Sequence, residues 1–150
     1  MKTEKGVTLI SVTIYVIVML IVVSIITVLT VYFYRNVDVN SANEDFNQQY
    51  TRFNSYFTEE INRKGNKIAG YEDINDEEGN LKQRYIIFSS GNQYTFVKQN
   101  QAIYMNDTKI AENITGFEYS IQQTNGKTTI TVVISKGDNL TRTTNYTLVD

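Results

Sequence analysis

The most constraining feature of this chain is an apolar run from Val7 to Tyr34 that contains no charged residue. As a helix, these 28 residues would extend about 42 Å, which exceeds the roughly 30 Å hydrocarbon core of a bilayer. Valine and isoleucine are mediocre helix formers in water, but in lipid a single segment can satisfy its backbone only as a helix. The run therefore predicts a transmembrane helix over residues 7–35. Aromatic and basic residues suited to the far interface close it: Tyr32, Phe33, Tyr34 and Arg35.

Basic residues precede the run. Lys2 and Lys5 place residues 1–6 in the cytoplasm by the positive-inside rule, and the C-terminal part outside the cell membrane. A cleaved secretory signal is the competing interpretation, but its apolar core spans roughly 7–15 residues and ends at small residues. This run is about twice as long and no Ala-x-Ala pattern follows it, so a retained single-pass anchor is favoured.

Composition limits the chemistry. The chain of 150 residues has no cysteine and no histidine, which excludes Ser-His-Asp and Cys-His sites and thiolate metal sites. Its net charge of −2 argues against a nucleic-acid surface, which needs a basic stripe. An enzyme would depend on Asp, Glu, Lys or Tyr alone, and no paired carboxylates stand in a defined setting. We therefore predict no catalytic residue, metal or cofactor, no direct nucleic-acid partner, and no enzymatic function.

The junction between the charged leader, residues 1–6, and the apolar run is the most informative motif. It reads Lys5-Gly6-Val7-Thr8-Leu9-Ile10-Ser11. This junction resembles the class III signal of type IV prepilins and type II secretion pseudopilins, in which a short basic leader ends in Gly before Phe-Thr-Leu-Ile-Glu. The resemblance implies cleavage between Gly6 and Val7 by a membrane aspartyl peptidase, followed by methylation of the new amine of Val7. Lys2 and Lys5 would then belong to the removed leader.

Two positions depart from the family pattern. Val7 replaces the usual Phe, a tolerated variation. Ser11 replaces the Glu that, in the family, is thought to pair with the N-terminal amine of an earlier subunit. A lone carboxylate in hydrocarbon is costly, and the family's Glu therefore favours docking at a position beside a cation. Its absence leads to the hypothesis that this subunit caps or initiates a filament.

The apolar pattern changes after the run. One face carries apolar residues at helical spacing: Val39, Ala42, Phe46, Tyr50, Phe53, Phe57 and Ile61. This pattern predicts an amphipathic helix over residues 36–65 that continues the membrane helix and ends near Lys64-Gly65. Together the two parts would form a helix of about 58 residues, on the order of 87 Å.

The rest of the chain, residues 66–150, is expected to form a small antiparallel β-sheet packed on this helix. Turn signals include Ser90-Gly91-Asn92, Asn106-Asp107, Asn125-Gly126 and Gly137-Asp138-Asn139. The predicted strands are Arg84–Ser89, Gln93–Lys98, Ala102–Met105, Ile114–Gln122, Thr128–Ser135 and Thr141–Leu148. The predicted fold is α+β and pilin-like: a long N-terminal helix on an antiparallel sheet.

An acidic segment, Tyr71–Asn80, precedes the strands. It contains Glu72, Asp73, Asp76, Glu77 and Glu78. Some pseudopilins bind calcium in a loop, but the spacing here does not match an EF-hand, and a solvated turn is the favoured interpretation.

The order of the C-terminal elements resembles that of the ComGF, GspJ and PilW groups of minor pseudopilins, by pattern and not by invariant residues. The resemblances imply a minor pilin or pseudopilin of a type IV pilus, type II secretion or competence system. Its partners would be other pilins or pseudopilins, the prepilin peptidase, an inner-membrane assembly platform and membrane lipid. The alternative is an uncleaved single-pass anchor that carries an extracytoplasmic binding module.

Overall fold

The computed structural model describes residues 3–148, and within them the side chains of residues 9–37 and 41–148. The chain forms two compact units, Met1–Ala42 and Asn43–Asp150. A single α-helix, α1 (Thr3–Ile61), supplies the described part of the first unit and the first element of the second. The long N-terminal helix predicted from the sequence is therefore present.

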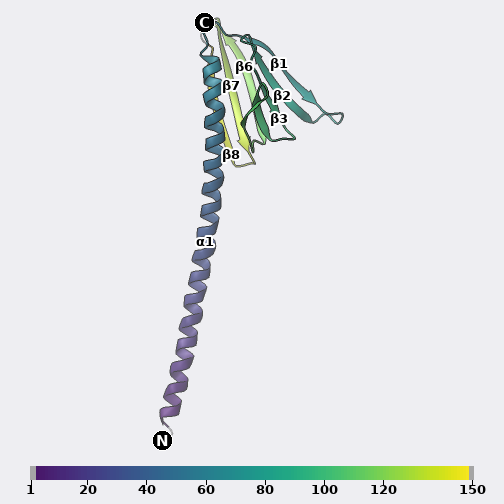
Figure 1. The fold of residues 1–150 in the computed structure, drawn as a ribbon. Helices are drawn as coiled ribbons and strands as arrows, with labels where there is room; N and C mark the ends of the chain where they lie inside the picture. The colour runs from purple at the N-terminus through teal and green to yellow at the C-terminus, as the bar shows by residue number, and fades with distance from the viewer. Residues whose placement is uncertain (1–2, 149–150) are drawn as a thin grey trace. The chain divides into compact units, whose positions relative to one another are not determined.

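All the strands of the described chain lie in the second unit, after α1. They are β1 (Ile68–Asn75), β2 (Leu81–Phe88), β3 (Gln93–Val97), β4 (Ala102–Met105), β5 (Thr108–Ala111), β6 (Gly116–Thr124), β7 (Lys127–Lys136) and β8 (Leu140–Thr147). Strands β1 to β5 form one antiparallel sheet in chain order, and β6 to β8 form a second. Figure 1 shows the three-stranded sheet beside the end of α1. The α+β class is confirmed.

The sequence predicts one sheet, and this part of the prediction is wrong. The link between β5 and β6 turns away from β5. Asn113 in this link adopts the left-handed conformation, with a φ of 57°. The amide of Ile114 donates to the carbonyl of Gln101 at 2.8 Å, and the amide of Thr115 donates to the carbonyl of Ser135 at 2.8 Å. These bonds direct the chain into a new sheet, because β6 then pairs with β7 and not with β5.

The predicted solvated turn over Tyr71–Asn80 is wrong in its first half, which belongs to β1. Acidic residues have low strand propensity, but here they pair across to β2. The Arg84 guanidinium donates to both carboxylate oxygens of Asp73, at 2.6 and 2.5 Å, and the Tyr85 hydroxyl donates to Glu72 at 2.5 Å. The second half is a turn as predicted. The short strand β5 was also not predicted.

The hydrophobic core lies between α1 and both sheets. Phe57 of α1 is fully buried and its ring contacts aromatic rings of the five-stranded sheet, Phe88 and Tyr94, at centroid distances of 5.6 and 5.0 Å. On its other side it contacts Tyr146 of β8 at 4.8 Å. Phe53 likewise contacts Phe117 of β6 at 5.8 Å. One helix face thus holds the two sheets together.

The predicted apolar face of the amphipathic helix is confirmed where the structure describes it. Phe46, Phe53, Phe57 and Ile61 are buried and Tyr50 is half-buried. The side chain of Val39, also assigned to this face, lies outside the described residues.

The helix ends at Ile61, three residues before the expected Lys64. Asn66 explains the early end, because its side-chain amide donates to the carbonyl of Glu60 at 2.8 Å and takes the place of a continuing helical N–H. Gly65 follows with a φ of +70°, the left-handed conformation expected for a glycine just after a helix.

Candidate membrane and assembly segment

The apolar part of α1 is not a core helix. Every large apolar side chain from Leu9 to Val37 is exposed, by between 47% and 75% of its surface. The best window of this helix has a mean hydropathy of 3.0 and none of it is buried. Within the described residues, α1 is the one helix long and apolar enough to cross a membrane.

Exposure of these apolar side chains to water would cost a large free energy. Covering a Val, Leu, Ile, Phe or Met side chain is worth about 1.5–3 kcal/mol, so the nineteen exposed ones from Leu9 to Val37 amount to tens of kcal/mol. The segment therefore needs a nonaqueous environment, which lipid or the apolar helices of other chains can provide.

Four hydroxyls within the segment are satisfied by the helix itself. The hydroxyls of Thr13, Ser24, Thr27 and Thr30 each donate to the carbonyl four residues earlier, at 2.8–2.9 Å. Such bonds remove the cost of placing a hydroxyl in hydrocarbon. The segment can thus pass between lipid and a helix–helix contact without leaving these donors unpaired.

Aromatic residues stand at the C-terminal end of the apolar segment. Tyr32 and Phe33 meet edge to face at 6.2 Å, and both are exposed. Aromatic rings at such an end are typical of the interface between a membrane and water. Tyr15 lies within the run, eight residues after Val7.

The residues of the predicted cleavage site are described only in their backbone. Lys5, Gly6 and Val7 lie in the first turns of α1, and their side chains fall outside the described set. Lys2 lies wholly outside the described residues. Ser11 lies on α1 with its side chain partly exposed. Cleavage, methylation and the role of Ser11 stay predictions.

The acidic turn uses its carboxylates locally. Asp76 accepts hydrogen bonds from the amides of Glu78 at 3.0 Å and Asn80 at 2.8 Å. These bonds, the Asn80 amide above all, lower the pKa of the Asp76 carboxyl below its usual range. Within the described residues, no group of three or more acidic side chains is arranged to hold a metal ion.

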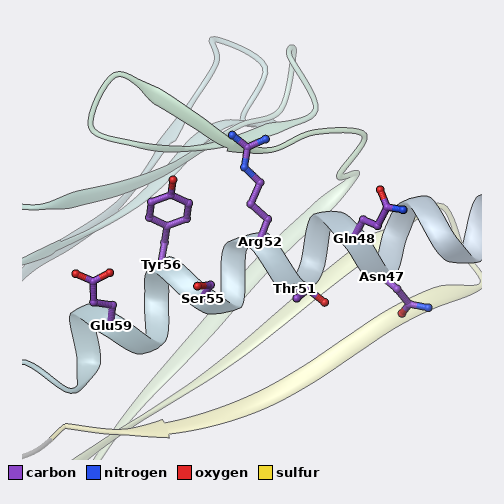
Figure 2. Close-up of a pocket in the computed structure, with 7 residues that line it drawn as sticks. All are labelled: Asn47, Gln48, Thr51, Arg52, Ser55, Tyr56 and Glu59. Carbon is purple, nitrogen blue, oxygen red and sulfur yellow. The ribbon is translucent and has the colours of Figure 1, made fainter.

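The outer face of α1 is polar, as the sequence pattern indicates. Figure 2 shows an open concavity lined by α1 alone: Asn47, Gln48, Thr51, Arg52, Ser55, Tyr56 and Glu59. Arg142 of β8 donates to Asn47 at 3.1 Å along one side of this face. The concavity is shallow and open on one side.

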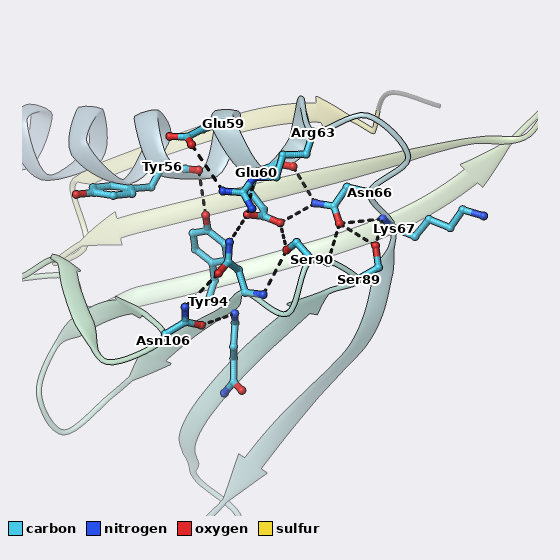
Figure 3. Close-up of polar contacts among 12 residues, drawn as sticks. Tyr56, Glu59, Glu60, Arg63, Asn66, Lys67, Ser89, Ser90, Tyr94 and Asn106 are labelled. Atoms are coloured by element: carbon cyan, nitrogen blue, oxygen red, sulfur yellow. Dashed lines mark hydrogen bonds and ion pairs between the residues drawn. The ribbon is translucent and has the colours of Figure 1, made fainter.

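A buried polar network at the end of α1 was not predicted from the sequence (Figure 3). The Glu60 side chain is 1% exposed and accepts hydrogen bonds from Asn66 at 2.7 Å, from Asn92 at 2.6 Å and from the Ser90 hydroxyl. Arg63 adds a cation 3.6 Å away. The network fastens the helix end to the turn between β2 and β3. Its one sequence signal is that Glu60 follows Phe57 by three residues, which places a carboxylate on the apolar face.

A second cluster, also not predicted, joins the two sheets. Arg84 of β2 binds Asp73, donates to the carbonyl of Phe117 at 3.0 Å, and lies over the ring of Tyr119 at 5.7 Å. The hydroxyl of Tyr119 donates back to the carbonyl of Tyr85 at 3.1 Å. Burial raises the pKa of Tyr119 to about 12, so the hydroxyl remains a donor at any physiological pH.

No protein-family model, curated protein or solved structure matches this chain.

Proposed function

We propose that this chain is a minor pilin or pseudopilin, a structural subunit of a type IV pilus or of a type II secretion or competence pseudopilus. The junction Lys5-Gly6-Val7-Thr8-Leu9-Ile10 carries the proposal, because it stands where the charged leader meets the apolar helix. Cleavage between Gly6 and Val7 and methylation of Val7 would prepare the chain for assembly. The role is structural and not catalytic.

The exposed apolar segment supports this proposal. Before assembly the segment crosses the cell membrane, with its N-terminus in the cytoplasm and its sheet unit outside. In a filament, the helices of other subunits replace lipid around it. Removal of Lys2 and Lys5 takes away cations that resist passage through hydrocarbon. The inner-membrane assembly platform and the prepilin peptidase would act on the chain before that transfer.

Ser11 favours a place at the tip or in initiation. A subunit without a carboxylate at this position cannot form the ion pair with the amine of an earlier subunit. It is therefore suited to a position where no earlier subunit exists.

The test is incorporation into filaments. The tagged chain is expressed in a host that assembles such filaments, which are sheared from the cells and imaged with a gold-labelled antibody. The expected result is label at filament ends, and its loss with Gly6→Val, which blocks cleavage. Label along the whole filament would contradict the tip position. A wild-type chain that stays wholly in the membrane fraction would favour the alternative, an uncleaved anchor with an extracytoplasmic binding module.

A further inference from the structure

Strand β1 is an edge strand with an open side. It pairs with β2 along Ile68–Asn75, and within the described residues no strand pairs with its other side. Every second residue of an edge strand directs its N–H and C=O groups away from the sheet, where another extended chain can bind them. All the side chains of β1 from Tyr71 to Asn75 are exposed.

The same strand carries exposed apolar side chains. Outside the apolar segment of α1, the large apolar residues that the structure exposes are Tyr71, at 61%, and Ile74, at 39%. Both lie on β1, on opposite faces, since neighbouring residues of a strand alternate. The ring of Tyr71 meets that of Tyr119 of β6 edge to face at 6.0 Å, and beside it is a concavity of mixed lining, apolar at Ile68, Ile121 and Leu148 and polar at Asn66, Lys67 and Gln123. A strand added at this edge would thus find apolar contacts on both of its faces.

The charge of this edge selects the added strand. The charge is net negative from Lys67, which lines the concavity beside Tyr71, to Arg84: there are five acidic side chains and three basic ones, Lys67, Lys82 and Arg84. Among the described ion pairs, only Asp73 of the five has a cationic partner, namely Arg84. Glu77 and Glu78 extend the negative charge into the turn that follows β1. An incoming chain of basic character would therefore be attracted, and one of acidic character repelled.

Charge also decides against a second copy of this chain. Two β1 strands paired edge to edge would bring Glu72, Asp73 and their neighbouring carboxylates together, and like charges opposite each other destabilise a sheet. The acidic residues thus block self-pairing and leave the edge open to a partner of opposite charge.

We propose that β1 binds an extended segment of a partner protein by strand addition, and that this segment has a net positive charge from Lys or Arg. Main-chain hydrogen bonds would provide the affinity, and the acidic edge would provide the selectivity. The inference concerns the unit that begins at Asn43. It does not depend on cleavage after Gly6, and a failure of either proposal leaves the other standing.

The test uses the full chain in nonionic detergent and a labelled ten-residue peptide that alternates lysine with valine and threonine. Fluorescence anisotropy measures its binding. The expected result is saturable binding that is lost when every backbone nitrogen of the peptide is methylated, because methylation removes the donors of a strand. A peptide with glutamate in place of lysine is expected not to bind.

Two matched variants separate the edge from general charge. Glu77 and Glu78 are exposed, so E77K together with E78K should weaken binding by about tenfold. The control D107K, together with D138K, makes the same charge change in the exposed turns between β4 and β5 and between β7 and β8, and should alter binding less than twofold. Equal binding of the methylated peptide, equal effects of the two double variants, or no binding of the lysine peptide would each overturn the proposal.

Discussion

Replacement of Phe57 by alanine tests the core that joins α1 to both sheets. The ring is fully buried and contacts Phe53, Phe88, Tyr94 and Tyr146 at centroid distances of 4.8–5.6 Å. A buried Phe→Ala change costs about 3–5 kcal/mol, since it loses transfer free energy and leaves a cavity. Small domains have a total unfolding free energy of about 5–15 kcal/mol. We expect Phe57→Ala to remove about 4 kcal/mol, near the middle of that range of costs.

The measurement is urea unfolding of the full chain in nonionic detergent, followed by near-ultraviolet circular dichroism of its tyrosines. Ser55→Ala is the control, because Ser55 lies on the exposed face of the same helix and should change the unfolding free energy by less than about 0.5 kcal/mol. A loss below about 1 kcal/mol for Phe57→Ala would refute this account, because a ring in such a core cannot be removed so cheaply.

Two further predictions concern the sheets. The Arg84 guanidinium lowers the pKa of Asp73, so the folded state binds a proton at this carboxyl less readily than the unfolded state. The stability that the Asp73–Arg84 pair contributes should be complete above about pH 4 and should be lost as the pH falls through the lowered pKa of Asp73. Asp73→Asn should therefore reduce the loss of stability in acid, and urea unfolding measured from pH 5 to pH 2 checks this. Gly126 has a φ of +79° in the turn between β6 and β7, so Gly126→Ala should destabilise the fold by about 1 kcal/mol. Gly70 has no positive φ and open space around its Cβ position, so Gly70→Ala should instead stabilise by about 0.4–1 kcal/mol, and thermal unfolding of the two variants gives the comparison. A similar response of both glycines would contradict the assigned backbone conformations.

Local patterns predicted the elements that depend on local physics. The aromatic spacing of Phe46, Phe53 and Phe57 follows from helix geometry and needs no knowledge of the sheets. Asn125 and Gly126 both adopt positive φ, which the tight hairpin between β6 and β7 requires, and this dipeptide signals that turn by itself. The six predicted strands are present as β2, β3, β4, β6, β7 and β8.

The missed features depend on residues far apart in the sequence. Strand β1 has a composition typical of a solvated turn, and it forms because Arg84 and Tyr85 bind its carboxylates. The division into two sheets depends on amides of Ile114 and Thr115 that bond to carbonyls of Gln101 and Ser135. No periodicity in the sequence reports such bonds.

The candidate site divides in the same way. The length and apolar character of the segment could be predicted, because lipid imposes them on one helix alone. The buried Glu60 network could not, since it needs Asn66, Ser90 and Asn92 from later in the chain. The roles of Gly6, Val7 and Ser11 involve other proteins. They therefore follow from neither the sequence nor the fold of one chain.

The intact mass of the mature chain tests the central claim most directly. The full-length chain is co-expressed with an active prepilin peptidase and analysed by mass spectrometry, with Gly6→Val as the blocked control. The pilin account predicts that residues 1–6 are lost, that Val7 gains one methyl group, and that Gly6→Val retains the full-length mass. A wild-type chain of unchanged mass, or one cut after the apolar segment, would contradict it.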